Sequence, residues 1–153
     1  MVNPAVPSIR LQEIKMAKMK NEPALADKID KIIKRNYSST FMNNSKWVKL
    51  IGLLVKNHKL FDVCNVKLIY DDEIRQLIIQ GNETYELYYY QDSMEGMITK
   101  PITPGWVAYK EIEWISFPSD KSNTQALEIL IKKTGEFRSD VTVDYLRILA
   151  YLK

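Results

Sequence analysis

Two residues of this chain have side chains that could act as a nucleophile or a base, the single cysteine Cys64 and the single histidine His58. A Cys–His pair could support nucleophilic attack, whereas a zinc site needs three or four Cys, His or acidic ligands. His58 lies between Lys56 and Lys59 at the expected end of a helix, where an imidazolium suits the helix dipole. Cys64 falls in a segment of alternating apolar and polar residues, which is typical of a small buried side chain. We therefore expect neither a catalytic pair nor a zinc site.

The acidic residues offer a second kind of chemistry. Asp71–Glu73 is a run of adjacent carboxylates that could bind Mg²⁺ or Ca²⁺, but no EF-hand spacing follows it. Because metal ligands must converge in space, a solvated turn is the preferred interpretation. Glu111 and Glu113 share one face of an expected strand, yet acid–base catalysis also requires a pocket and shifted pKa values. With five dispersed glycines and no phosphate-binding loop, the sequence predicts no enzyme, no metal and no cofactor.

The composition favours one globular protein whose two parts differ in charge. The chain has 153 residues, of which 46% are hydrophobic and 27% charged, so a sizeable core is expected. Residues 1–60 carry 12 Lys and Arg against 4 Asp and Glu, whereas residues 61–153 carry 10 against 15. No apolar stretch reaches the roughly 18 residues of a membrane helix. One cysteine allows no internal disulfide and the N-terminus lacks a secretory pattern, so we expect a cytoplasmic protein.

Two helices are predicted at the N-terminus. Ser8 would cap a helix over residues 9–20, and Asn21 would cap a second helix with Pro23 in its first turn. The second helix carries apolar residues at i, i+4, i+7 and i+8, which form one buried stripe. The residues of this stripe are Leu25, Ile29, Ile32 and Ile33.

The polar and aromatic stretch Phe41–Trp47 could be either a chemical site or the start of a helix. Asn43 has the side chain of an N-cap, and Met42 and Trp47 occupy the positions of a hydrophobic staple. An apolar stripe continues from Trp47 at helical spacing. We therefore interpret this stretch as the beginning of a third helix that ends near residue 57, with Trp47 in the core.

Further along the chain the hydrophobic period changes from that of a helix to that of a strand. Alternation predicts strands over residues 63–70 and 106–117, and two more strands joined by a turn at residues 81–83. Side chains alternate between the two faces of a strand. In the strand 106–117, one face would carry Tyr109, Glu111 and Glu113, and the other Ile112, Trp114 and Ser116.

The C-terminal part adds one helix and one strand. Ser122 or Asn123 would cap the helix, and Gly135 would follow its end. The tail, residues 140–153, alternates as a strand, although its spacing would also suit a helix. The sequence thus predicts an α+β fold, with N-terminal helices packed on an antiparallel β-meander, followed by a helix and a final strand.

Three motifs in order suggest a family. Residues 41–47 read Phe-Met-Asn-Asn-Ser-Lys-Trp, residues 66–73 read Val-Lys-Leu-Ile-Tyr-Asp-Asp-Glu, and residues 109–115 read Tyr-Lys-Glu-Ile-Glu-Trp-Ile. This set resembles small bacterial immunity proteins, the antidotes of polymorphic or contact-dependent toxin systems. The resemblance covers residues 41–153, which implies a core domain there and a helical extension over residues 1–40. It implies no catalytic residues; it implies a protein partner, a cognate toxin domain that is bound and blocked.

The basic N-terminal helices suggest an alternative partner. Such a cluster of cations could neutralise the phosphates of a nucleic acid, or lie on a membrane surface or a protein. No aromatic residue alternates with the charges as in single-strand binders, so a solvated helix face is preferred. The cations are Lys15, Lys18, Lys20, Lys28, Lys31, Lys34 and Arg35.

The acidic part of the chain supplies the expected interface. If the toxin were a nuclease, its active site would be basic, and an acidic, tyrosine-bearing sheet face would oppose it. Tyrosine is also a good strand residue, so packing alone is the alternative explanation. The expected partner-binding residues are Glu83, Glu86, Tyr88, Tyr90, Asp92, Glu95, Tyr109, Glu111 and Glu113.

Overall fold

The protein has an α+β fold, as the sequence predicts. The computed structural model describes residues 9–20, 24–79, 91–95, 97–99 and 106–153. In these ranges the α-helices are α1 (Ile9–Met19), α2 (Leu25–Asn36), α3 (Asn44–Lys56) and α4 (Thr124–Thr134). Short 3-10 helices are η1 (His58–Leu60), η2 (Tyr109–Glu111) and η3 (Ser119–Lys121). The predicted caps at Ser8 and Asn21 and the turn at residues 81–83 lie outside the described residues.

Helix α3 begins as its sequence predicts. The side chain of Asn43 accepts a hydrogen bond from the backbone N–H of Lys46 at 2.8 Å, which satisfies one of the free donors of the first turn. The helix then buries the stripe Trp47, Leu50, Ile51 and Leu54. Trp47 is 2% exposed and its ring stacks on that of Tyr109, with 6.2 Å between centroids. The interpretation of Trp47 as a core residue is therefore confirmed.

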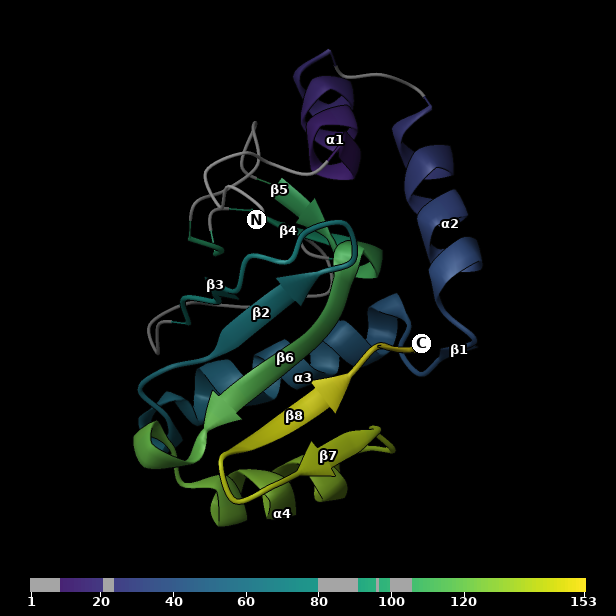
Figure 1. The fold of residues 1–153 in the computed structure, drawn as a ribbon. Helices are drawn as coiled ribbons and strands as arrows, with labels where there is room; N and C mark the ends of the chain where they lie inside the picture. Colours follow the sequence, from purple (N-terminus) through teal and green to yellow (C-terminus); the bar gives the residue numbers. More distant parts are fainter. Residues whose placement is uncertain (1–8, 21–23, 80–90, 96, 100–105) are drawn as a thin grey trace.

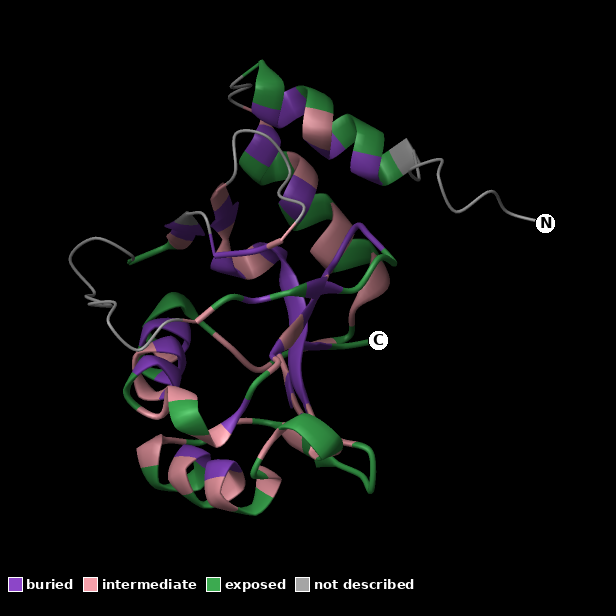
Figure 2. Cartoon of the chain, turned by 90° about the vertical axis from the view of Figure 1, so that its left-hand side faces the viewer, coloured by how far each residue is buried: buried purple, intermediate pink, exposed green. Residues whose placement is uncertain are grey.

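The main sheet is antiparallel and has the strand order β3-β2-β6-β8-β7. In Figure 1, α3 and α4 lie behind this sheet, and no helix covers its near face. The inward side chains, among them Val66, Ile115 and Ile148, are fully buried, and Figure 2 shows this burial along the sheet seen nearly edge-on. The strands are β2 (Asn65–Leu68), β3 (Arg75–Gln76), β6 (Ile112–Pro118), β7 (Ser139–Val141) and β8 (Tyr145–Leu149).

Within the described residues there are also two small sheets. Strand β4 (Ser93–Glu95) pairs with β5 (Trp106–Ala108), and β1 (Ser39–Thr40) pairs with β9 (Tyr151–Leu152). The C-terminal tail is thus extended, as the alternation predicts, although it forms three short strands, β7, β8 and β9, instead of one. Helix α4 starts at the cap Asn123, whose side chain accepts from the N–H of Ala126 at 3.2 Å.

The N-terminal helices share the core of the rest of the protein. Buried residues of α1 and α2 belong to the same hydrophobic cluster as α3 and the sheet. On α2, Leu25 and Ile29 are buried, and Ile32 and Ile33 pack partly against the core, as the predicted stripe requires. The division into residues 1–40 and 41–153 remains a prediction from the family resemblance, but in this structure α1 and α2 lie against the core.

The predicted strand over residues 106–117 is wrong in one respect. The chain is interrupted by η2, so β5 and β6 are separate strands that belong to different sheets. The pairing of β2 with β6 also shifts register, because Lys67 faces Trp114 while Leu68 faces Ile112. Glu113 is then the extra residue of a β-bulge. Simple alternation therefore fails to assign the side chains of this segment to two faces.

Candidate functional site

Three residues expected on an exposed face are in fact buried. Tyr109 and Glu111 are fully buried in η2, and Glu113 is buried at the bulge of β6. The prediction that these side chains point outward is wrong, because the 3-10 turn and the bulge break the strand alternation on which it depends.

The other expected partner-binding residues fall in one stretch. Asp92 is exposed directly before β4. Of Glu95 only the backbone, in β4, is described, and Glu83, Glu86, Tyr88 and Tyr90 lie outside the described residues.

Glu111 is the centre of a buried hydrogen-bond cluster. Its Oε1 lies 2.8 Å from Lys18 Nζ and accepts a hydrogen bond from the Tyr70 hydroxyl at 2.8 Å. Its Oε2 accepts from the backbone N–H of Ala108 at 2.6 Å. A buried carboxylate with three donors is satisfied, so this glutamate joins α1, the turn after β2 and the end of β5, and is not free for a partner.

Lys18 is buried, so it is not part of the basic surface that the sequence suggests. Besides Glu111, its ammonium group donates to the Trp106 carbonyl at 2.8 Å and lies 4.6 Å from the centroid of the Trp106 ring. Burial lowers the pKa of Lys18, and the interaction with Glu111 opposes that shift. No local pattern of the sequence could have found this pair, because its members are brought together only by packing.

Glu113 is likewise held inside the structure. The Tyr37 hydroxyl donates to its Oε1, and Lys67 Nζ lies 3.3 Å from the same oxygen. Burial, with further effects from Glu113, raises the pKa of Tyr37. Through these contacts Glu113 joins the bulge of β6 to β2 and to the segment after α2.

The acidic run Asp71–Glu73 only partly fits the solvated turn expected for it. Asp71 is buried and pairs with Arg75, whereas Asp72 and Glu73 are exposed. Asp71 also accepts from the backbone N–H of Glu73 at 3.1 Å, which closes the turn. Within the described residues, no group of three or more His, Cys, Asp or Glu side chains is placed to hold a metal ion.

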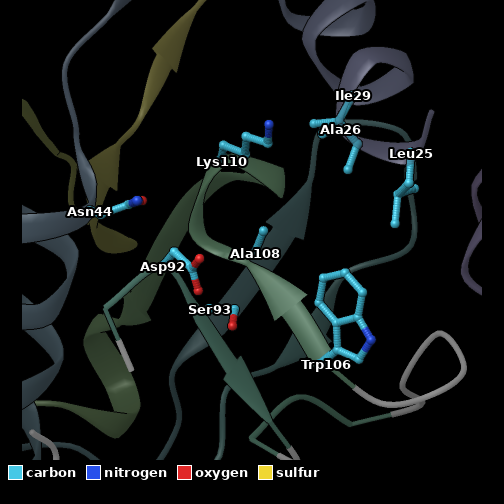
Figure 3. A pocket seen from close by; sticks show the side chains of 9 residues that line it. All are labelled: Leu25, Ala26, Ile29, Asn44, Asp92, Ser93, Trp106, Ala108 and Lys110. Carbon is cyan, nitrogen blue, oxygen red and sulfur yellow. The ribbon is translucent and has the colours of Figure 1, made fainter. Parts of the chain in front are cut away.

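A pocket of about 340 Å³ lies beside Asp92, the one expected partner-binding residue with a described, exposed side chain. Figure 3 shows Leu25, Ala26 and Ile29 of α2 on one side of this pocket, and Trp106 and Ala108 of β5 on the other. The remaining lining residues are Asn44, Asp92, Ser93 and Lys110.

The pocket combines an apolar wall with charged edges. Trp106 is half-buried, and its ring is held on one side by Lys18. Asp92 contributes a carboxylate, whereas Lys110 is paired with Asp30 at 3.0 Å. A pocket that combines an aromatic side chain with a carboxylate that no described cation pairs suits the binding of another molecule. Trp106 is not among the site residues predicted from the sequence, although a tryptophan at the start of a short strand is a signal that could have indicated it.

Neither nucleophile candidate belongs to this pocket. Cys64 is buried, and burial raises the pKa of its thiol, which disfavours the reactive thiolate. His58 lies in η1, with Nδ1 3.3 Å from the carbonyl oxygen of Val55. Neither residue lines the pocket.

A second cavity, of about 520 Å³, lies between α1 and α2. Four cations and one acid line it, together with two isoleucines. This cavity, a groove between the two helices, is lined by three of the basic residues named in the sequence, Lys28, Lys31 and Arg35. Arg10 of α1 lines it as well. The lining residues are Arg10, Glu13, Ile14, Lys28, Lys31, Ile32 and Arg35.

Comparisons with known proteins return no relative: no protein-family model, no curated protein and no solved structure matches this chain. Among the helices that the structure describes, none has the length and apolar composition needed to cross a membrane.

Proposed function

We propose that this chain is an immunity protein, which binds a cognate bacterial toxin domain in the cytoplasm and covers the functional surface of that toxin. In this proposal the protein is a binder, without enzymatic activity, metal or cofactor. The observation that carries it is the pocket that the half-buried Trp106 and the exposed Asp92 both line. The motif resemblance of residues 41–47 and 109–115 supports the same partner class.

The chemistry of the pocket suits a protein partner. Binding energy at protein interfaces concentrates in a few aromatic and arginine anchors that fill or border a pocket, whereas rim charges steer association. Here Trp106 and the apolar residues of α2 would bury a side chain of the toxin, and Asp92 would attract a basic surface such as that of a nuclease. Lys110 is already paired with Asp30, so the net attraction at this edge is for cations.

The burial of Glu111 and Glu113 removes both residues from the proposed interface. Because both carboxylates are bonded inside the protein, they support the shape of the surface and do not contact the toxin. Tyr109 has the same supporting role through its stacking on Trp47. The proposed contact residues are therefore Asp92 and Trp106, followed by the sequence neighbours Glu83, Glu86, Tyr88, Tyr90 and Glu95.

The test first searches the genes next to this one for a large secreted toxin, and its toxin domain is then used as the candidate partner. The protein and the toxin domain are produced together in bacteria, survival is scored, and association and dissociation rates of the purified pair are measured. Asp92→Lys should slow association, because it replaces an attracting charge by a repelling one. Ala26→Arg, at an exposed position of α2 that lines the pocket, should speed dissociation by filling the pocket.

Asp120→Lys is the matched control, because Asp120 is an exposed acid in η3 at the other end of β6. It should leave protection and both rates unchanged. If Asp92→Lys and Ala26→Arg fold and still protect like the parent, the toxin does not bind at this pocket. If the parent protein neither binds the toxin nor protects, the immunity proposal is wrong.

A small nucleic-acid-binding or regulatory protein is the second candidate, and the groove between α1 and α2 favours it. Its four cations could neutralise phosphates. With three or four phosphate contacts, affinity measured by fluorescence anisotropy between about 50 mM and about 200 mM salt should then fall about 40- to 150-fold for a duplex DNA. For a single-stranded RNA the expected fall is about 20- to 50-fold. Lys31→Glu with Arg35→Glu should abolish this binding. Weak binding that these changes do not affect would exclude the candidate.

A further inference from the structure

The face of the five-stranded sheet opposite α3 and α4 carries a group of polar and aromatic side chains, of which Trp114 and Ser116 are buried and Arg147 is half-buried. Trp114 faces Lys67 on β2 and Leu149 on β8, while Ser116 faces Asn65 and Arg147. These residues alternate with Ile115, which is buried on the helix side, so they point away from α3 and α4. No helix lies in front of this face in Figure 1, and Figure 2 shows α3 and α4 on the other side of the sheet.

Arg147 is the centre of this face. Its guanidinium carbon lies 3.9 Å from the centroid of the Trp114 ring and 4.2 Å from that of the Tyr145 ring. Contact with two aromatic faces restrains the planar group and reduces the side-chain entropy that binding would cost. Trp, Tyr and Arg are also the residue types that contribute most to binding at protein interfaces.

The hydrogen-bond donors of Arg147 are not used within the part of the chain that the structure describes. Its Nε is buried without a hydrogen-bond partner. Asp140 faces Arg147 across the pairing of β7 with β8, yet no described carboxylate lies within ion-pair distance of the guanidinium. A donor without an acceptor is unfavourable. Because Nε itself is enclosed, a partner's acceptor would reach this guanidinium through its terminal nitrogens.

We propose that this face is a second protein-docking surface, on which Arg147 binds a carboxylate side chain of a partner protein. The surface, named here the Arg147 face, consists of Asn65, Lys67, Trp114, Ser116, Tyr145 and Arg147. Carboxylates match the planar donor fork of arginine, and the unpaired positive charge supplies the electrostatic complementarity.

A protein carboxylate suits the Arg147 face better than a nucleic acid does. The other cation, Lys67, is already paired with Glu113 at 3.3 Å, so the face offers one unpaired charge and not the several that a phosphate backbone requires. Asn65 and Ser116 add neutral hydrogen-bonding groups beside it. None of these six residues lines the pocket beside Asp92, so the inference holds whether or not that pocket binds a toxin.

The test uses a short poly-glutamate peptide with blocked ends as the probe, and a thymidine oligonucleotide of equal charge as its competitor. Binding is followed by NMR through the Nε–H signal of Arg147 and the indole N–H signal of Trp114. The peptide should shift both signals in a saturable manner. Arg147→Gln should weaken the peptide affinity by about tenfold or more, as for an anchor residue.

Arg138→Gln is the matched control, because Arg138 is an exposed arginine that lies over a single ring, 5.5 Å from the centroid of Phe41. It should change the peptide affinity less than twofold, and unchanged melting of both variants would show that they fold. Saturable peptide binding that leaves the Arg147 and Trp114 signals unmoved would overturn the proposal, as would an Arg147→Gln variant that binds like the parent. Equal or tighter binding of the oligonucleotide at these signals would show a nucleic-acid surface instead.

Discussion

The ammonium group of Lys18 on α1 lies 2.8 Å from the carboxylate of Glu111 in η2, and both side chains have no exposed surface. This contact joins the first described helix to the turn between β5 and β6. The same lysine also donates to the Trp106 carbonyl, so the ion pair positions one wall of the pocket beside Asp92.

Breaking this ion pair by removing one partner should be strongly destabilising. Lys18→Met or Glu111→Gln alone should lower the free energy of unfolding by about 3–5 kcal/mol, because the remaining group stays buried without its partner. The double variant Lys18→Met with Glu111→Gln should cost less than the sum of the two. Urea denaturation measures all three values.

The surface pair Lys132 and Glu128, with 2.8 Å between charged atoms and side chains that are 69% and 31% exposed, is the control. Lys132→Met should change the unfolding free energy by about 0.5 kcal/mol or less, since surface ion pairs contribute little. Single variants at Lys18 and Glu111 that are as stable as the parent would show that the buried pair is not formed in solution.

Trp47 should be one of the most sensitive core positions. It is 2% exposed and stacks on Tyr109, so Trp47→Ala should destabilise the protein by about 3–5 kcal/mol, the cost of removing a large buried aromatic side chain. Trp47→Phe should cost less, because it keeps part of the ring contact. Met19→Ala, at a position that is 67% exposed, should stay within about 0.5 kcal/mol of the parent. A Trp47→Ala variant that melts like the parent but loses partner binding would contradict the core assignment.

Removal of the helix cap at Asn43 should lower stability less than Trp47→Ala does. Asn43→Ala removes the acceptor for the Lys46 N–H and should cost about 1 kcal/mol of stability. Asn43→Asp keeps an acceptor at the same place and should retain most of the stability. Thermal and urea unfolding of the two variants would separate the hydrogen bond from a general loss of side-chain contacts; equal losses would exclude the capping role.

Alkaline conditions should weaken the fold through its buried tyrosines. Burial, together with a contribution from Asp30, raises the pKa of Tyr151 from 10.0 to about 12. Because the folded protein holds this proton more tightly than the unfolded chain, the stabilisation is complete below pH 10.0 and is lost as pH rises to about 12. The pKa values of Tyr70 and Tyr37 are raised as well, mainly through burial.

Tyr151→Phe tests this dependence. The variant also loses the hydrogen bond to the Lys110 carbonyl, so its stability falls at every pH, and the informative quantity is the slope. The decline of the unfolding free energy between pH 10.0 and about 12 should be shallower than in the parent. Lys18 has the opposite effect, because its lowered pKa makes stability rise with pH. This contribution is the same in the parent and in Tyr151→Phe, so it does not alter the difference between their slopes. Identical slopes would contradict the assigned shift.

Local sequence determined much of the secondary structure. Asn43 and Asn123 cap their helices as predicted, and the stripe that starts at Trp47 is buried, because a cap and a 3.6-residue period act within a few neighbouring residues. The extended C-terminal tail follows from its alternation in the same way. These features depend on contacts that are close in sequence, and they suffice for the α+β class.

Tertiary structure alone decided which charges remain on the surface. Glu111 and Glu113 were expected to face outward, but a 3-10 turn, a β-bulge and partners from distant segments, Lys18 and Tyr37, enclose them. Burial of a charge is favourable only when a partner is present, and no local pattern in the sequence shows which distant group will supply it. For the same reason the pocket at Trp106 and the stacking of Arg147 on Trp114 arise only when separate strands and helices pack together.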